Sequence, residues 1–308
     1  MYDLIIIGAG PAGLTAALYA GRYRLKTLIL EKLAVGGQIL LTPGIENFPG
    51  FPGGIATDQL IEQMKNQVLD VGVKIDSEEV LKIEETTGIK PSSFIVTTKD
   101  GSYMAKSIIV AVGAQTKRLG AEGEDRLAGR GVSYCGTCDG PLFKNKDIVV
   151  VGAGDRAIED ALFLTSHARK VTIIHRRQEL RASRILQEKA RGNKKITFLL
   201  DSVLEAILGK DRVEAVRVKN LKTQNISEIP CQGVFVFVGI TPSTGFLKGV
   251  LQLDEPGFII TNEEMVTSRT GIFACGDCRK KALYQVVNAC GEGAVASYSV
   301  NKYILETR

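Results

Sequence analysis

One stretch of this sequence occurs twice, and that repeat restricts the possible folds more than any other feature. Residues 3–32 read DLIIIGAGPAGLTAALYAGRYRLKTLILEK, residues 147–176 read DIVVVGAGDRAIEDALFLTSHARKVTIIHR, and the two align without a gap. Each copy contains an apolar run, a glycine turn, a helical stretch rich in Ala and Leu, and a second run rich in β-branched residues. This order predicts a βαβ unit with the glycine pattern that binds a dinucleotide.

The small residues of the two turns have separate tasks. The first glycine permits a tight strand-to-helix turn, the second lets the backbone approach a pyrophosphate, and the third small residue lets the helix pack on the strand. Unpaired N–H groups at the helix start then face the phosphates. One such turn alone is a weak sign, but two copies in the same setting predict two dinucleotide sites. The predicted contacts are Gly8, Gly10, Pro11, Ala12, Gly13, Gly152, Gly154 and Ala157.

The end of the second strand distinguishes the two sites. Glu31 stands where an acid accepts hydrogen bonds from both ribose hydroxyls of an adenosine, so the first site suits FAD or NAD. The second copy has His175 at this place, followed by Arg176, Arg177 and Arg181. An acid there would repel a 2′-phosphate, whereas guanidinium groups bind one, so the second site suits NADPH. The alternative is a solvated basic face at the start of a helix.

Two further segments bear on the first site. After Glu31 comes VGGQILLTPGIENFPGFPGG, whose glycines and prolines exclude a long helix, and Gln38 and Asn47 are its side chains best suited to bond a ring edge. Near the C-terminus a predicted strand, a turn at Gly276 and Asp277, and a helix of small residues follow one another. An aspartate there can bond a ribityl hydroxyl, and the helix can direct its N-terminus at a flavin carbonyl. A plain helix N-cap is the alternative.

The two repeats predict the fold class and the domains. We expect an α/β protein with two nested Rossmann-like dinucleotide-binding domains. If the C-terminal segment completes the first site, the FAD-binding domain is discontinuous and comprises residues 1–115 and 246–308. The NADPH-binding domain, residues 116–245, is then inserted between the two halves and carries a CxxC pair.

That pair of cysteines precedes the second repeat, in GVSYCGTCDGPLF. Three interpretations compete for Cys135 and Cys138: half of a zinc site, inert buried thiols, or a redox-active disulfide. A structural zinc needs four ligands, and the second pair, Cys275 and Cys278, lies far away in the sequence, so we expect no metal. A CxxC pair can close a small disulfide ring and favours one thiolate, which supports the redox interpretation. We expect Cys275 and Cys278 to be packing residues, because Cys275 ends an apolar strand.

Composition narrows the location and the partners. The 308 residues carry a formal net charge of +5 without a long run of like charges, which gives little support to a nucleic-acid or membrane-surface partner. Strand-like apolar residues begin at Leu4, which leaves no room for a signal peptide. No apolar run approaches the roughly 18 residues of a membrane span. We therefore expect a cytoplasmic protein with no nucleic-acid or membrane partner.

Taken together, these motifs resemble those of the low-molecular-weight thioredoxin reductases, a family of homodimeric FAD enzymes that use NADPH. The similarity rests on GAGPAG near the start, GGQ and ENFPG after the first repeat, CxxCDG before the second, HRR with a further arginine, and a closing GD segment. It covers essentially all of residues 1–308. Its most specific element is CxxCDG inside the NADPH domain, because related flavin disulfide reductases carry their cysteines in the FAD domain.

The resemblance implies an activity and a mechanism. A hydride passes from NADPH to FAD, electrons reduce the Cys135–Cys138 disulfide, and the dithiol then exchanges with oxidised thioredoxin. Cys138 faces the flavin, Cys135 attacks the substrate, and Asp139 donates the proton. The inserted domain would rotate about two crossings, near residues 115 and 245, between the half-reactions.

The resemblance also implies cofactor contacts. Those to FAD would come from Glu31, Gly37, Gln38, Asn47, Gly276, Asp277, Gln285 and Val286. Those to the NADP phosphate would come from His175, Arg176, Arg177 and Arg181. Several positions depart from the family pattern, and two of them concern cofactor contacts. Arg156 replaces a small hydroxyl residue and would add an anion contact beside the pyrophosphate, and Tyr284 replaces the arginine that usually precedes Gln285.

Three other functions stay open from the sequence. The first is an NAD(P)H oxidase, or a reductase of another small disulfide, which uses the same flavin chemistry with a different acceptor. The second is the flavoprotein of a peroxide-reducing system, which usually carries an additional N-terminal thioredoxin-like region; none is expected here, because the first motif starts at residue 3. The third is a non-catalytic nucleotide- or zinc-binding regulator, which a flavin spectrum bleached by NADPH would exclude.

Overall fold

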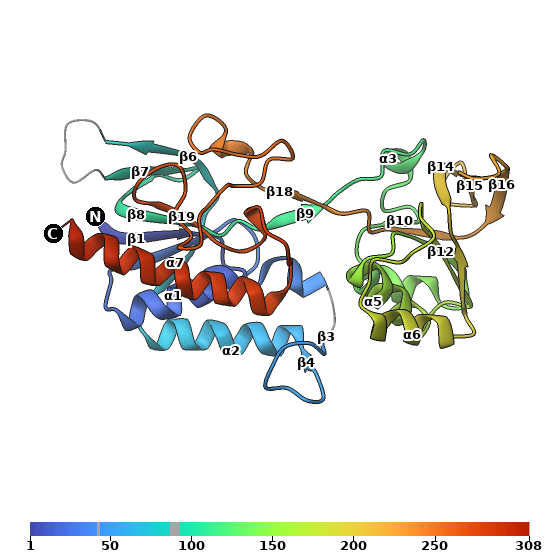
Figure 1. Ribbon diagram of the computed structural model, residues 1–308, viewed down its shortest axis with the longest axis horizontal. Helices are drawn as coiled ribbons and strands as arrows, with labels where there is room; N and C mark the ends of the chain where they lie inside the picture. Colours follow the sequence, from blue (N-terminus) through green and yellow to red (C-terminus); the bar gives the residue numbers. More distant parts are fainter. Residues whose placement is uncertain (42–43, 87–92, 308) are drawn as a thin grey trace. The chain divides into compact units, whose positions relative to one another are not determined.

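The chain forms two compact units (Figure 1). The computed structural model describes residues 1–41, 44–86 and 93–307, apart from the side chains of Leu41, Thr137 and Cys138. Unit 1 comprises Met1–Gln115 and Thr241–Arg308, and unit 2 comprises Thr116–Ile240. Unit 1 is therefore built from two chain segments, and unit 2 is continuous.

A seven-stranded sheet lies at the centre of unit 1, in the order β5-β2-β1-β8-β7-β6, with β19 also paired to β8. Its strands are β1 (Tyr2–Ile7), β2 (Thr27–Glu31), β5 (Lys74–Ser77), β6 (Val80–Glu85), β7 (Phe94–Thr98), β8 (Ser102–Val110) and β19 (Ile272–Ala274). Strands β1, β2, β5, β8 and β19 pair in parallel, and β6 and β7 add an antiparallel edge. The first repeat thus forms the predicted parallel βαβ unit.

Both faces of this sheet are covered, which explains the unbroken apolar run of β1. Leu4 and Ile6 belong to the buried cluster on the helical face, and Ile5 and Ile7 to the cluster on the opposite face. The helices of unit 1 are α1 (Pro11–Arg22), α2 (Thr57–Asp70) and α7 (Val286–Glu306). Between β2 and α2 the described residues form the 3-10 turn η1 (Gly37–Leu41) and the short strands β3 (Gly44–Ile45) and β4 (Ile55–Ala56). Thr42 and Pro43, part of the predicted loop, lie outside the described residues.

Helix α7 packs closely along α1, as Figure 1 shows. The contact depends on a missing side chain: a Cβ at Gly293 would lie 2.2 Å from Ala12 O. Gly291, on the same helix, has nothing within 4 Å of such a Cβ. The last helix of the chain therefore completes the unit that the first repeat begins.

Unit 2 repeats the same plan with its own parallel sheet, in the order β10-β17-β11-β12-β13. These strands are β10 (Val132–Ser133), β11 (Asp147–Val151), β12 (Lys170–Ile174), β13 (Ile196–Leu199) and β17 (Gly233–Val236). The helices are α3 (Glu124–Leu127), α4 (Gly136–Asp139), α5 (Asp155–Leu164) and α6 (Arg184–Gly192). A three-stranded antiparallel sheet joins β14 (Ser202–Leu208), β15 (Ala215–Asn220) and β16 (Ile226–Pro230). The second repeat forms β11, α5 and β12, again with parallel pairing.

The two segments that connect the units pair with each other. Strands β9 (Ala114–Thr116) and β18 (Ile240–Pro242) form a two-stranded sheet. The sequence predicts the second crossing near residue 245, whereas the structure ends unit 2 at Ile240. The difference arises because Ser243 N donates to Gly113 O at 3.1 Å and Thr244 Oγ1 donates to Gly257 O at 2.6 Å, which ties these residues to unit 1.

Candidate dinucleotide and disulfide sites

Both glycine turns lie between a parallel strand and a helix start. Gly8 has φ +107° and Gly152 has φ +126°, and a Cβ there would lie only 2.4 and 2.2 Å from neighbouring carbonyl oxygens. No other residue type fits such a turn without strain. Gly10 and Gly154 occupy the N-cap positions of α1 and α5, so no side chain caps either helix. The helix N–H groups at both turns therefore remain available to a pyrophosphate.

Glu31, at the end of β2, supports the first turn. Its Oε2 accepts a hydrogen bond from Ala9 N at 2.7 Å, and its Oε1 accepts one from Leu33 N at 2.9 Å. An ionised carboxylate has about four acceptor sites, so about two remain for ribose hydroxyls. Glu31 therefore suits the adenosine end of the predicted first site.

Two predicted flavin contacts from opposite ends of the chain meet in the structure. Asn47 Nδ2 donates to Gln285 Oε1 at 3.1 Å. Gln285 is the N-cap residue of α7 and Val286 its first residue, with no side-chain cap and no acid in the first turn. Gln38 lies exposed on η1. Amide side chains and an uncapped helix start can together donate to and accept from the edge of a flavin ring.

Asp277 lies within the 3-10 turn η4 (Gly276–Cys278) and does not cap α7, which excludes the plain N-cap interpretation. Its Oδ1 is buried and lies 2.9 Å from Lys281 Nζ, but no described residue gives that oxygen an aligned hydrogen bond. Oδ1 therefore keeps an acceptor site for a hydroxyl group, as a ribityl chain would require.

A buried charge network holds the Asp277 turn, and sequence reasoning does not identify it. Glu292 on α7 accepts hydrogen bonds from Gly276 N at 2.8 Å and from Arg279 Nη1 at 2.7 Å. Lys281 Nζ lies 3.4 Å from the same carboxylate, and the side chains of Lys281 and Glu292 are only 4% and 7% exposed. In the sequence, Glu292 is an acid in a helix rich in small residues that follows several cations, and a local pattern does not show which of these cations it contacts.

Three exposed arginines follow β12. Arg176, Arg177 and Arg181 are exposed, and none forms an ion pair with an acid in the described part of the chain. The backbone N–H groups of Arg181 and Ala182 donate to Ala153 O at 2.8 and 3.0 Å. These bonds hold the arginine segment against the second glycine turn, where a nucleotide phosphate would lie.

His175 differs from these arginines because it is buried. Its Nε2 lies 3.1 Å from Glu179 O, and since a carbonyl can only accept, Nε2 carries the proton. Burial lowers the pKa of His175, the hydrogen bond with Glu179 opposes this in part, and the neighbouring arginines lower the pKa further. His175 thus supports the loop as a neutral ring, and its contact with a phosphate stays a prediction.

Cys135 is disulfide-bonded and immediately precedes α4. Its N donates to Ser133 Oγ at 3.1 Å, and Asp139 N donates to its O at 3.3 Å. The predicted partner, Cys138, lies on α4, but its side chain is outside the described part of the structure. Asp139 ends α4, and its side chain forms no cap hydrogen bond with the described residues of the next turn.

The remaining cysteines are reduced. Cys231, Cys275, Cys278 and Cys290 form no disulfide. Cys275 and Cys278 are 0% exposed, and burial raises the pKa of Cys275 well above its usual value and that of Cys278 to about 12. Thiols that do not ionise are poor nucleophiles, so these two behave as small apolar residues.

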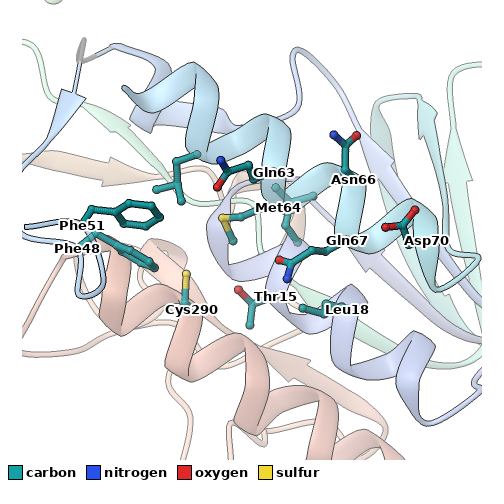
Figure 2. A pocket seen from close by; sticks show the side chains of 12 residues that line it. Thr15, Leu18, Phe48, Phe51, Gln63, Met64, Asn66, Gln67, Asp70 and Cys290 are labelled. Atoms are coloured by element: carbon teal, nitrogen blue, oxygen red, sulfur yellow. The ribbon is translucent and has the colours of Figure 1, made fainter. Parts of the chain in front are cut away.

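A pocket of about 580 Å³ opens in unit 1 beside α1 and α2. Figure 2 shows Leu18, Phe48 and Met64 on its walls, with Cys290 of α7 at one side. None of the residues assigned to a cofactor lines it, although Cys290 Sγ lies 3.9 Å from Pro11 O of the first dinucleotide turn. Burial also raises the pKa of Cys290, which keeps that thiol protonated.

Within residues 1–41, 44–86 and 93–307, no group of three or more His, Cys, Asp or Glu side chains could hold a metal ion. No helix of the same ranges is long and apolar enough to cross a membrane.

Two dinucleotide turns and a disulfide in one chain are typical of redox proteins that couple a nucleotide cofactor to a disulfide. Comparison with known proteins leads to the same class. A family model described as pyridine nucleotide-disulphide oxidoreductase matches residues 2–293, and the chain belongs to this family. Its relatives are thioredoxin reductases: that of Peptoclostridium litorale is 44% identical over 99% of this chain and 98% of the relative. The crystal structure of the Lactococcus lactis thioredoxin reductase matches with a TM-score of 0.96, at 41% identity over 99% of this chain and 100% of that one. That of T. acidophilum matches with a TM-score of 0.93, at 32% identity over 99% of each chain.

These matches confirm two predictions. The resemblance to the low-molecular-weight thioredoxin reductases is confirmed by relatives that span nearly the whole chain. The α/β fold class with Rossmann-like domains is confirmed by the two solved structures. The family implies a flavin and a pyridine nucleotide as cofactors.

Proposed function

We propose that the protein is an NADPH-dependent thioredoxin-disulfide reductase with FAD in unit 1 and NADPH in unit 2. One observation carries the choice of cofactors: equivalent ends of the two βαβ units hold opposite charges. Glu31 follows the first, and three exposed arginines follow the second. A carboxylate suits ribose hydroxyls, and guanidinium groups suit a 2′-phosphate. Thioredoxin is the substrate named by the relatives.

The residues of unit 1 bind and orient the flavin nucleotide. Bound FAD supplies two-electron chemistry between a nicotinamide and a disulfide. Glu31 would accept from the ribose, the uncapped start of α1 would bind the pyrophosphate, and Asp277 Oδ1 would accept from the ribityl chain. Asn47 and Gln285, already bonded to each other, would hold the ring edge at the start of α7.

The residues around Cys135 carry out the exchange. Reduction adds two electrons and two protons, breaks the S–S bond and leaves two thiols. The Cys135 thiol loses its proton, and the resulting thiolate attacks one sulfur of the thioredoxin disulfide and displaces the other, which takes a proton. Cys138 attacks the mixed disulfide, releases reduced thioredoxin and restores the enzyme disulfide. Asp139, at the end of α4, is the proposed proton donor.

The distribution of these residues implies a conformational step. The disulfide and the arginines belong to unit 2, and the flavin-side residues belong to unit 1. Unit 2 must present its two sites to the flavin in turn, and the paired crossings β9 and β18 are the proposed hinge. The proposal includes a homodimer, which the family resemblance implies, and a cytoplasmic location, which the sequence composition favours.

The test begins with the purified protein. Anaerobic NADPH should bleach its flavin absorbance, and NADPH should drive the reduction of at least one member of a thioredoxin panel. Oxygen consumption is followed in parallel. If the protein consumes oxygen but reduces no member of the thioredoxin panel, it is an oxidase, and the proposal is contradicted.

The arginines give a sharper prediction about the nucleotide. Replacing Arg176 and Arg181 with Gln should raise the KM for NADPH by about tenfold or more per lost contact, because a hydrogen bond to a charged group is worth about 1.5–3 kcal/mol. The KM for NADH and the kcat should change little. Arg191→Gln, at an exposed arginine in the last turn of α6, is the matched control. Equal KM values for the two nucleotides in the parent enzyme would contradict the assignment.

A further inference from the structure

A buried carboxylate lies directly behind the disulfide loop of unit 2, and no step of the exchange described above uses it. Asp160, on α5, is 2% exposed. Its Oδ1 faces Gly136, the residue after Cys135: a Cβ built on Gly136 would lie 2.7 Å from that oxygen. The carboxylate can approach the loop this closely because residue 136 has no side chain.

Arg156, one helical turn earlier on α5, contacts Tyr134, the residue before Cys135. Its Nη2 donates to Tyr134 O at 3.4 Å, and its guanidinium lies 5.6 Å from the centre of the Phe237 ring. The guanidinium and the carboxylate of Asp160 are not closely paired. Arg156 Nε and Asp160 Oδ2 are 3.8 Å apart, and neither atom has a hydrogen-bond partner among the described residues. Both charges therefore remain incompletely compensated beside Cys135.

We propose that Asp160 is a positioning residue that controls how readily the Cys135 sulfur becomes a thiolate. The inference rests on the proposed function, in which that thiolate attacks the thioredoxin disulfide. When Asp160 is protonated, its carboxylate no longer offsets the positive charge of Arg156, which then favours the thiolate. When Asp160 is ionised, its charge offsets Arg156 and repels the thiolate. The reactivity of Cys135 therefore depends on the protonation of Asp160.

The surroundings of Asp160 place this change near neutral pH. Burial raises the pKa of Asp160 to about 7, against a smaller opposing effect of Arg156. The other charged groups are Glu159, its neighbour on α5, and Asp139 on α4, which packs against α5. The sheet and α6 meet α5 through apolar side chains such as Leu186. No cation other than Arg156 contributes to the pKa of Asp160 among the described residues.

The test measures the alkylation of Cys135 in the full-length Cys138→Ser protein, where Cys135 cannot form the proposed disulfide. Iodoacetamide converts the thiolate to a thioether and releases iodide. Peptide mass spectrometry separates Cys135 from Cys231, Cys275, Cys278 and Cys290. The rate is followed from about pH 5.5 to about pH 9, with and without a second substitution on α5.

The expected result is a difference that appears only as Asp160 ionises. Asp160→Asn should match the parental rate below about pH 6 and be roughly threefold to tenfold faster at about pH 8. Glu159→Gln removes the exposed acid next to Asp160, whose charge raises the pKa of Asp160, so it should shift the pH profile to slightly lower pH without abolishing its break. Rates of Asp160→Asn that coincide with the parent over the whole range would overturn the proposal. A Glu159→Gln effect of equal size would do the same.

Two further measurements keep the test decisive. If Asp160→Asn does not fold, the Cys138→Ser profile must still show a break near the raised pKa of Asp160, about 7, and a single simple titration overturns the proposal. Arg156→Met should slow alkylation where Asp160 is protonated, because the favourable charge is lost. The assay needs no turnover. Failure to reduce thioredoxin would therefore contradict the proposed function while leaving this result intact.

Discussion

Two cysteine pairs of this chain have the same spacing but different surroundings. Cys135 is partly buried and disulfide-bonded, in a loop whose backbone bonds connect it to Ser133 and Asp139. Cys275 and Cys278 are 0% exposed and reduced. A thiol must be able to ionise before it can exchange, so the surroundings of a CxxC pair decide its chemistry more than its spacing does.

The pair formed by Cys135 and Cys138 gives the first prediction at this scale. Cys138→Ser should abolish thioredoxin reduction while NADPH still reduces the flavin, because the pair is separate from both glycine turns. Stopped-flow flavin absorbance and a thioredoxin assay measure the two half-reactions. Cys290→Ser, at a partly buried thiol of unit 1, is the control and should keep both. Thioredoxin turnover at the parental rate in Cys138→Ser would show that the redox pair is wrongly assigned.

The buried pair, Cys275 and Cys278, gives the second prediction. Cys275→Ala combined with Cys278→Val should keep FAD bound and keep turnover within roughly threefold of the parent, because both changes preserve small apolar volume. Flavin content and steady-state thioredoxin reduction check it. If turnover is lost while flavin is retained, a second thiol pair takes part. If flavin is lost, the Asp277 turn has been disturbed.

At the scale of elements, the contact between α1 and α7 joins the two segments of unit 1. Gly293 and Gly291 lie on the same helix, but only the first meets the backbone of α1. The helix therefore needs a glycine at one of these positions and merely tolerates it at the other.

The two glycines accordingly predict opposite effects. Gly291→Ala should raise the free energy of unfolding by up to about 1 kcal/mol, because alanine favours a helix over glycine. Gly293→Ala should lower it by about 1–3 kcal/mol and weaken FAD retention, because the added methyl group pushes α7 away from α1. Urea unfolding and flavin content after gel filtration measure both. Shifts of the same sign in the two variants would be inconsistent with this packing.

The sequence predicts the elements whose signals are local. Apolar periodicity and glycine turns suffice to identify β1–α1–β2 and β11–α5–β12, because each signal lies within a short stretch. Contacts between distant segments carry no such signal. The bond of Asn47 to Gln285 and the role of Glu292 depend on where α7 lies. In the sequence, Asp160 cannot be distinguished from other helical acids, and only the folded structure shows that its carboxylate lies against Gly136.

At the scale of the whole molecule, Asp160 links stability to pH. Burial raises its pKa from 3.8 to about 7, so the folded protein binds this proton more tightly than the unfolded chain. Its contribution to the stability of the fold is fully present below the unfolded-state pKa of 3.8 and is lost as the pH rises through the folded-state pKa of about 7. His175 has a lowered pKa and acts in the opposite sense, its contribution being lost as the pH falls.

Comparing the parent with Asp160→Asn isolates this group, since His175 is common to both proteins. The Tm advantage of Asp160→Asn should be smallest near the unfolded-state pKa of 3.8, grow as the pH rises to about 7, and then stay constant. Thermal unfolding followed by circular dichroism across this range checks the slope. Glu159→Gln, at an exposed acid that contributes less than burial does to the raised pKa of Asp160, should show a much weaker slope. An advantage that is constant or shrinks with rising pH would refute the burial argument.

The insertion of unit 2 between two segments of unit 1 also determines the order in which the two units unfold when the chain is pulled from one end. A molecular motor that pulls on the chain after α7 loads the contact of Gly293 with α1 first. The chain passes from unit 1 to unit 2 through β9 and returns through β18, and these two strands are paired. A force applied from the C-terminal side therefore acts on unit 2 only after the segment from Thr241 onward has been unfolded. Extraction from that side would dismantle the first dinucleotide site while the disulfide loop of unit 2 was still folded.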